Sequence, residues 1–146
     1  MFNFLKKKES SKPQQIDIIS KTASLLIHAA KIDENYSDIE KKIIKKTLSD
    51  LGTDKEQLEE IFNNAELAEK NSNQILEFTR EIKNSDEKFK IKIVETLWCI
   101  IYSDRKSDMY ESNFMRRLTG LIYLDNKIVG NIKEKIKKKF TNDLPG

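Results

Sequence analysis

Apolar residues recur along the chain at the three- and four-residue spacing of amphipathic α-helices. The segment 16–32 shows this most clearly, because one apolar stripe runs along its whole length. That stripe consists of Ile16, Ile19, Ala23, Leu26 and Ala30, and it is widened by Ile18, Leu25 and Ile27. A stripe this broad predicts a helix that is buried on more than one side.

The same spacing continues through three further predicted helices. The first of them follows Ser37 and ends near Gly52, a residue type that often follows the last helical turn. The next opens at Thr53, with Glu56 three residues later in the capping-box pattern, and the third has Ser72 as its expected N-cap. The inward positions expected in these helices are Ile39, Ile43, Ile44, Leu48, Leu58, Ile61, Phe62, Ala65, Ile75, Leu76, Phe78 and Ile82.

Residues 89–102, FKIKIVETLWCIIY, are ambiguous because their first residues alternate between apolar and Lys as in a β-strand. The length of this run, its lack of turn residues and a near-four-residue spacing favour a helix. Two more helices are expected after Asp108 and from about Asn126. The inward positions of these last three helices are Phe89, Ile93, Leu97, Ile100, Phe114, Met115, Leu118, Leu121, Ile122, Val129, Ile132, Ile136 and Phe140. The pattern therefore predicts an all-α fold, a single compact domain of about seven helices.

The chain also repeats itself at an offset of 71 residues. EKKIIKK at 40–46 aligns with ESNFMRR at 111–117, and SLLIHAA at 24–30 aligns with ETLWCII at 95–101. Two copies of this length indicate a domain of two pseudo-symmetric halves, whereas a solenoid needs three or more repeats. We expect a helical domain over 16–140, with halves at about 16–70 and 86–140. A flexible basic tail over 1–15 and a C-terminal tail over 141–146 flank it.

Composition narrows the class of protein further. A chain of 146 residues can build one well-buried core. Its single cysteine, Cys99, cannot form an internal disulfide or a zinc site of several cysteines. No apolar run approaches the roughly 20 residues of a membrane-spanning helix, and the N-terminus does not resemble a signal peptide. We therefore expect a cytoplasmic protein.

The net charge of +3 is distributed unevenly. Residues 1–12 carry four Lys against one Glu, and residues 126–146 carry six Lys against two acids. Most Lys-rich faces are simply solvated, and we expect no nucleic acid partner. The N-terminal segment is nevertheless a candidate for contact with an anionic membrane surface. Its apolar and basic residues are Phe2, Phe4, Leu5, Lys6, Lys7 and Lys8.

Two acidic turns connect predicted helices, and each carries a Glu that fits helix capping. Glu40 lies three residues after Ser37, and Glu111 lies three residues after Asp108. In such a capping box the first side chain accepts the amide of the Glu, and the Glu accepts the amide of the cap residue. Each cap contributes about 0.5–2 kcal/mol to stability, so neither Glu needs a ligand.

The aspartates that begin these turns, Asp33 and Asp104, are less easily explained. Each lies at the C-terminal end of a helix, where the helix dipole disfavours a carboxylate by about 0.3–1 kcal/mol. An Asx-turn would account for them structurally. Alternatively, Asp33 with Glu40, or Asp104 with Glu111, binds a divalent cation, or the turns form a patch for an unknown protein partner. An EF-hand is excluded because Asp38 stands where that loop requires Gly.

No catalytic residue emerges from the remaining candidates. His28 and Cys99 lie within the apolar stripes of two predicted helices, so core packing is the simpler interpretation of both. The sequence contains no Gly-rich phosphate loop, nucleophile elbow or helix-borne pair of histidines. We expect a protein that is not an enzyme.

At the two acidic turns the chain resembles the tellurite-resistance TerB-like family, including the related N-terminal domain of DnaJ-type membrane co-chaperones. That family shows the pattern AxADGxxxxxE twice, and the matching segments here are AAKIDENYSDIE (29–40) and IIYSDRKSDMYE (100–111). The resemblance implies an all-α fold of two related halves and a role in stress or tellurite resistance. It also implies acidic metal sites at the four acids of the turns. Glu34 and Arg105 stand where the family has Gly.

Overall fold

The computed structural model describes residues 17–32, 36–72, 75–103 and 109–142. For residues 109–112 and 141–142 only the backbone is described. Within these ranges all regular secondary structure is helical, which confirms the predicted all-α fold. An N-terminal helix is described over 17–30. It is followed by α2 (Asp38–Asp50), α3 (Lys55–Lys70), α4 (Leu76–Thr79), the 3₁₀ helix η1 (Ile82–Asn84), α5 (Glu87–Ser103), α6 (Met109–Leu121) and α7 (Asn126–Asn142).

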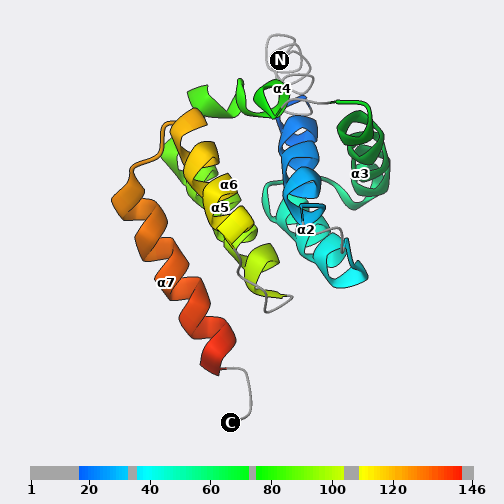
Figure 1. Ribbon diagram of the computed structural model, residues 1–146. Coiled ribbons are helices and arrows are strands. Elements are labelled where there is room, and N and C mark those ends of the chain that lie inside the picture. The colour runs from blue at the N-terminus through cyan, green and yellow to red at the C-terminus, as the bar shows by residue number, and fades with distance from the viewer. Residues whose placement is uncertain (1–16, 33–35, 73–74, 104–108, 143–146) are drawn as a thin grey trace, which may run out of the picture.

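Helix α5 lies at the centre of the packing. It packs against α7 along one side and against α2 on the other, while α2 also contacts α3 (Figure 1). The short α4 contacts α6. Because α5 is enclosed by other helices, apolar residues occupy more than one of its faces, which explains why its sequence resembles a strand. Its buried apolar residues are Ile93, Val94, Leu97, Trp98, Ile100 and Ile101.

The other helices complete one apolar core. The N-terminal helix is buried on several sides, as its broad stripe predicts. Inward positions of α2, α3, α6 and α7 pack with it and with α5 in a single cluster. The buried apolar residues outside α5 are Ile19, Ala23, Leu25, Leu26, Ile27, Ala30, Ile44, Leu48, Ile61, Phe62, Ala65, Ile75, Phe78, Ile82, Met115, Leu118, Ile122, Leu124, Val129, Ile132 and Ile136.

Two of the expected inward positions are wrong. Ile39 is 60% exposed and Leu76 is 45% exposed. Ile39 lies five residues before the fully buried Ile44, or about 140° around a helix of 3.6 residues per turn, so the two cannot share one face. In α4, which is only four residues long, the buried positions are Phe78 and Thr79.

The predicted N-caps of α3 and α4 are also wrong. The amide of Thr53 donates to the oxygen of Leu48 at 3.1 Å, so Thr53 closes the end of α2 and α3 starts one residue later, with Asp54 as its N-cap. Glu56 is then too close to the cap for a capping box. The amide of Ser72 donates to the backbone carbonyl oxygen of Glu69 at 3.2 Å, so Ser72 similarly closes the end of α3. The N-cap of α4 is Ile75.

Helix boundaries repeat along the chain. Helices α2 and α6 are offset by 71 residues at both ends, and the starts of α3 and α7 are offset by the same number. This is the offset at which the sequence aligns with itself. The repeated boundaries support the predicted duplication, which superposition of the two halves tests directly.

The turns that follow α2 and α6 share one hydrogen-bonding pattern. Gly52 in the first turn and Tyr123 in the second both have left-handed backbones, with φ of 103° and 57°. In each turn the next amide donates to a carbonyl five residues earlier, as in a Schellman motif. These bonds join Thr53 N to Leu48 O and Leu124 N to Thr119 O, both at 3.1 Å. Gly52 therefore ends α2 in the way that the sequence predicts.

Candidate functional site

The first acidic turn leads from the N-terminal helix into α2, and its Glu40 is part of a complete capping box. The amide of Ser37 donates to Glu40 Oε1 at 2.8 Å, and the amide of Glu40 donates to Ser37 Oγ at 3.2 Å. The Ser37 hydroxyl also donates to Glu40 Oε1, at 3.1 Å. The structure therefore confirms the predicted capping role of both residues, with Glu40 only 1% exposed.

The other residues predicted for the acidic turns fall largely outside the described part of the chain. Asp33, Asp104 and Asp108 all lie outside it. Glu111 lies in the first turn of α6, but its side chain is not described. Helix α6 begins at Met109, immediately after the predicted cap. The predicted cation sites at the two turns therefore stay predictions. The tail residues predicted to contact a membrane, in the range 2–8, also lie outside the described ranges.

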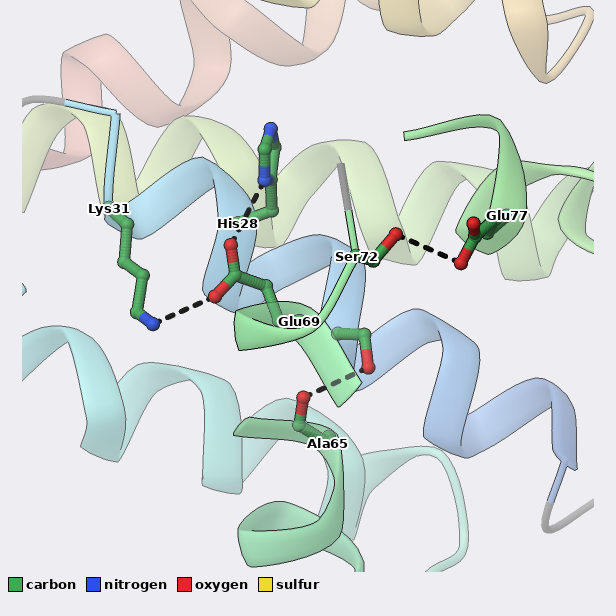
Figure 2. A network of polar contacts seen from close by, with 7 residues as sticks. His28, Lys31, Ala65, Glu69, Ser72 and Glu77 are labelled. Carbon is green, nitrogen blue, oxygen red and sulfur yellow. Dashed lines mark hydrogen bonds and ion pairs between the residues drawn. The ribbon is translucent and has the colours of Figure 1, made fainter. Parts of the chain in front are cut away.

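Beside the first turn, the end of α3 forms polar contacts with the N-terminal helix. The Glu69 carboxylate accepts a bond from Lys31 Nζ at 2.7 Å and lies 3.1 Å from His28 Nδ1 (Figure 2). In the same region the Ser24 hydroxyl donates to the oxygen of Ala65 at 3.1 Å. Glu69 is buried, with a side chain 9% exposed, whereas the side chains of His28 and Lys31 are about one-third exposed.

The prediction that His28 is a core residue is wrong. Its side chain is 35% exposed, and its ring contacts the Glu69 carboxylate on one side and lies 6.0 Å from the Phe114 ring. The imidazole lies at the rim of the apolar stripe, where its polar nitrogen reaches a partner on another helix. His28 therefore joins the N-terminal helix to α3 through a polar contact.

Tyr36 lies among the acids of α2 and α3. Its hydroxyl donates to Glu66 Oε2 at 3.0 Å. Burial, this hydrogen bond and the charges of Glu66, Glu40 and Glu69 together raise the pKa of Tyr36 well above its usual range. The hydroxyl therefore stays protonated, and its environment is electronegative. The nearby cations are Lys31 and Lys41, whose Nζ atoms lie 5.7 and 4.9 Å from the centre of the Tyr36 ring.

The acidic residues around Tyr36 come from two separate parts of the chain, and only one of these parts is recognisable from the sequence. Glu40 belongs to a local motif, whereas Glu66 and Glu69 lie about thirty residues further on, in α3. No local motif links them to the first turn, and only the packing of α3 against the N-terminal helix brings them there. Among the residues that the structure describes, no group of three or more His, Cys, Asp or Glu side chains is arranged to hold a metal ion.

Cys99 packs on α5 at the edge of the core, as a partly buried residue. Burial raises the pKa of its thiol, so the thiolate is scarce at neutral pH. It lines a cavity of about 400 Å³ together with residues of α2, α5 and α7. Two threonines in this cavity, Thr47 and Thr96, are hydrogen-bonded to each other at 2.7 Å. The thiol thus has the character of a packing residue rather than of a nucleophile.

Comparison with known families extends the likeness beyond the two turns. The family model described as Tellurite resistance protein TerB matches residues 20–134. No curated protein and no solved structure gives a significant match to the chain. The matched range contains the segments 29–40 and 100–111, and it runs from the N-terminal helix into α7. Separately, none of the described helices is both long enough and apolar enough to span a bilayer.

Proposed function

The chain belongs to the tellurite resistance protein TerB family, and from this we propose that it is a non-enzymatic module of stress response or tellurite resistance. The observation that carries the proposal is the extent of the family match, which covers most of the helical domain and both acidic turns. The cytoplasm is the compartment that we propose for it. This fits a chain whose one cysteine is a partly buried thiol.

We further propose that the acidic turns bind a divalent cation, with Asp33 and Glu40 in the first turn and Asp104 and Glu111 in the second. Carboxylate oxygens are the ligands that hard cations prefer. In the first turn, support comes from the electronegative environment around Tyr36, to which Glu40, Glu66 and Glu69 contribute. Ser37 holds the Glu40 carboxylate in place through two hydrogen bonds, so this ligand is oriented before a cation arrives.

A specific observation favours a second function, in which the turns are structural and the protein is an adaptor that binds a protein partner at a membrane surface. Glu40 already completes a capping box, so its presence is explained without a cation. The basic segment over residues 2–8 would supply the membrane contact of such an adaptor.

Thermal melting of variants with and without divalent cations separates the two functions. A cation that binds only the folded state at 100 times its Kd stabilises it by about 2.7 kcal/mol. We expect Ca²⁺, Mg²⁺, Mn²⁺ or Zn²⁺ to raise the Tm of the natural chain and to do so less in Asp33→Asn and Asp104→Asn. Asp38→Asn, at an exposed acid in the first turn of α2, is the matched control.

Two results would contradict the cation proposal. One is the absence of heat when each of these cations is titrated into the protein in a calorimeter. The other is an equal loss of Tm in Asp33→Asn with and without cations, because this assigns the aspartate to support of the turn. For the adaptor, co-sedimentation with anionic liposomes is compared for the full chain and a chain lacking residues 1–12. Equal pelleting of both counts against membrane contact by the tail.

A further inference from the structure

A cavity of about 460 Å³ opens between the start of the N-terminal helix, the α2–α3 turn and the start of α5. This volume is within the range of about 300–1,000 Å³ that is usual for ligand-binding pockets. Its apolar wall is formed by Ile18, Ile19, Leu51, Ile61 and Phe89. The cavity is separate from the acidic turns and from the contacts around Glu69.

Polar groups lie at defined points of this cavity. The Thr53 hydroxyl oxygen is buried and has no hydrogen-bond partner among the described residues. Two carboxylates, Asp54 and Asp86, also line the cavity. Asp54 makes no side-chain capping bond. The cavity therefore suits an occupant with an apolar part and positive charge.

At the equivalent position of its second half the chain has an apolar residue. The residue 71 positions after Thr53 is Leu124, which is 7% exposed and belongs to the apolar core. The amides of Thr53 and Leu124 both donate to a carbonyl five residues earlier, so the two positions differ in their side chains. Where the second turn places a leucine in the core, the first turn has a smaller polar residue and a cavity beside it.

We propose that this cavity binds the chain's own N-terminal segment, residues 2–8, with Phe2, Phe4 and Leu5 against the apolar wall. The lysines Lys6, Lys7 and Lys8 would then lie beside the cavity carboxylates. The segment matches the cavity in chemical character, because three apolar residues and three positive charges lie within its seven positions.

The tail can reach the cavity easily. Ile18 and Ile19, in the first described turn of the N-terminal helix, are part of the cavity wall. Residues 6–16 connect Leu5 to this point, and an extended chain of that length spans about 40 Å. The segment can therefore fold back over the start of its own helix without strain.

Occupation of the cavity would withhold residues 2–8 from a membrane, so the two placements of the tail exclude each other.

Isoleucine methyl NMR of the full chain tests the proposal. Ile18, Ile19 and Ile61 line the cavity, whereas Ile136 on α7 does not and is the internal control. Aromatic rings shift the resonances of methyl groups that they contact. We expect Phe2→Ser/Phe4→Ser to shift the three cavity methyls and to leave Ile136 unchanged. Cavity methyl resonances that are identical with and without the two rings would overturn the proposal.

Thr53→Leu fills the cavity with the side chain that the second half uses at the same position. In this background, removal of the two tail rings should no longer shift the cavity methyls. Asp54→Asn should reduce the shift without filling the cavity, and Glu60→Gln, at an exposed residue of α3, is its charge-matched control. A shift unaffected by both Thr53→Leu and Asp54→Asn would overturn the proposal.

Two other occupants give distinct results. Ring-dependent shifts that increase with protein concentration would assign the rings to a second copy of the chain. The third possible result is that removal of the tail rings leaves the cavity methyl resonances unchanged, while addition of phenethylammonium shifts them. This would mark a site for a small aromatic amine. Either result overturns binding of the chain's own tail.

Discussion

Gly52 and Tyr123 both have a left-handed backbone, although their side chains are very different. For a residue with a Cβ atom this conformation costs roughly 1–2 kcal/mol, a cost that glycine avoids. Tyr123 is 71% exposed, and its ring lies 5.4 Å from Lys83 Nζ. A cation–π contact at an exposed site contributes about 0.5–1 kcal/mol, so it offsets part of the strain.

Alanine substitutions at two glycines should have opposite effects on stability. A Cβ atom meets no atom within 4 Å at either Gly52 or Gly130, so backbone conformation alone decides the result. We expect Gly52→Ala to lower the free energy of unfolding by about 1–2 kcal/mol. Gly130→Ala, in the interior of α7, should raise it by about 0.5–1 kcal/mol. Urea denaturation measures both, and two changes of the same sign would contradict the prediction.

Residues of local motifs were predictable from sequence, whereas residues of tertiary contacts were not. Ser37 and Glu40 are three positions apart, so their capping box is visible in the sequence. Tyr36 and Glu66 meet only after α3 has packed, and nothing near either residue indicates the other. The prediction of Thr53 as an N-cap is wrong because its amide donates to the carbonyl oxygen of Leu48. This bond places Thr53 at the end of α2 and not at the start of α3.

At the level of helices, Glu69 joins α3 to the N-terminal helix. We expect Glu69→Gln to lower the free energy of unfolding by about 1–3 kcal/mol, because the amide cannot serve both Lys31 and His28 as a charged acceptor. The exposure of its two partners keeps the loss below that of a fully buried pair. Glu60→Gln, on the exposed face of the same helix, should have little effect. Equal stability of the two variants in chemical denaturation would contradict this role.

A second link, between α2 and α5, should depend on pH. Asp50 Oδ2 lies 3.1 Å from Lys92 Nζ, and this hydrogen bond is the main cause of the lowered pKa of Asp50. A carboxyl whose pKa is lower in the folded state stabilises the fold above its unfolded pKa, about 3.9, and loses that effect as pH falls through the folded value.

Asp50→Asn should therefore destabilise the protein slightly at pH 7 and not at all below the folded pKa of Asp50. The effect at pH 7 should stay within the roughly 0.2–1 kcal/mol typical of exposed ion pairs. Comparing urea denaturation of both chains from pH 7 to pH 2 measures it. A stability difference that is the same across this range would show that the charge of Asp50 has no part in the link.

Helix order was easier to predict than helix ends. The strong apolar periodicity identified α2, α3, α6 and α7, and the length of the α5 run decided correctly against a strand. The region between α3 and α5 differs, because α4 has only four residues and is followed by a 3₁₀ helix. Four residues contain barely one turn, so periodicity cannot indicate which side faces inward, and Leu76 was assigned wrongly.

On the scale of the whole molecule, one core joins both halves of the chain. Buried residues of the N-terminal helix, α2 and α5 belong to the same cluster as those of α6 and α7. Trp98, the single tryptophan, is 4% exposed on α5, and Lys133 of α7 lies 5.2 Å from its ring. Its fluorescence therefore reports on packing at the centre of the domain.

This shared core predicts a single cooperative unfolding transition. Leu48→Ala, a truncation of a fully buried residue of α2, should cost about 2–5 kcal/mol. It should shift the transition seen by Trp98 fluorescence and by circular dichroism to the same extent. A fluorescence transition that stays in place while the circular dichroism transition moves would show that the halves unfold separately.

The matched turns after α2 and α6 make the chain a natural template for engineering. Thr53 and Leu124 occupy equivalent places in two turns, and the amide of each donates to a carbonyl five residues earlier. Each turn therefore shows a side chain that is compatible with this backbone hydrogen bond. Exchanging the two residues would place the larger leucine beside the cavity and the smaller threonine in the second turn, with both backbones unchanged.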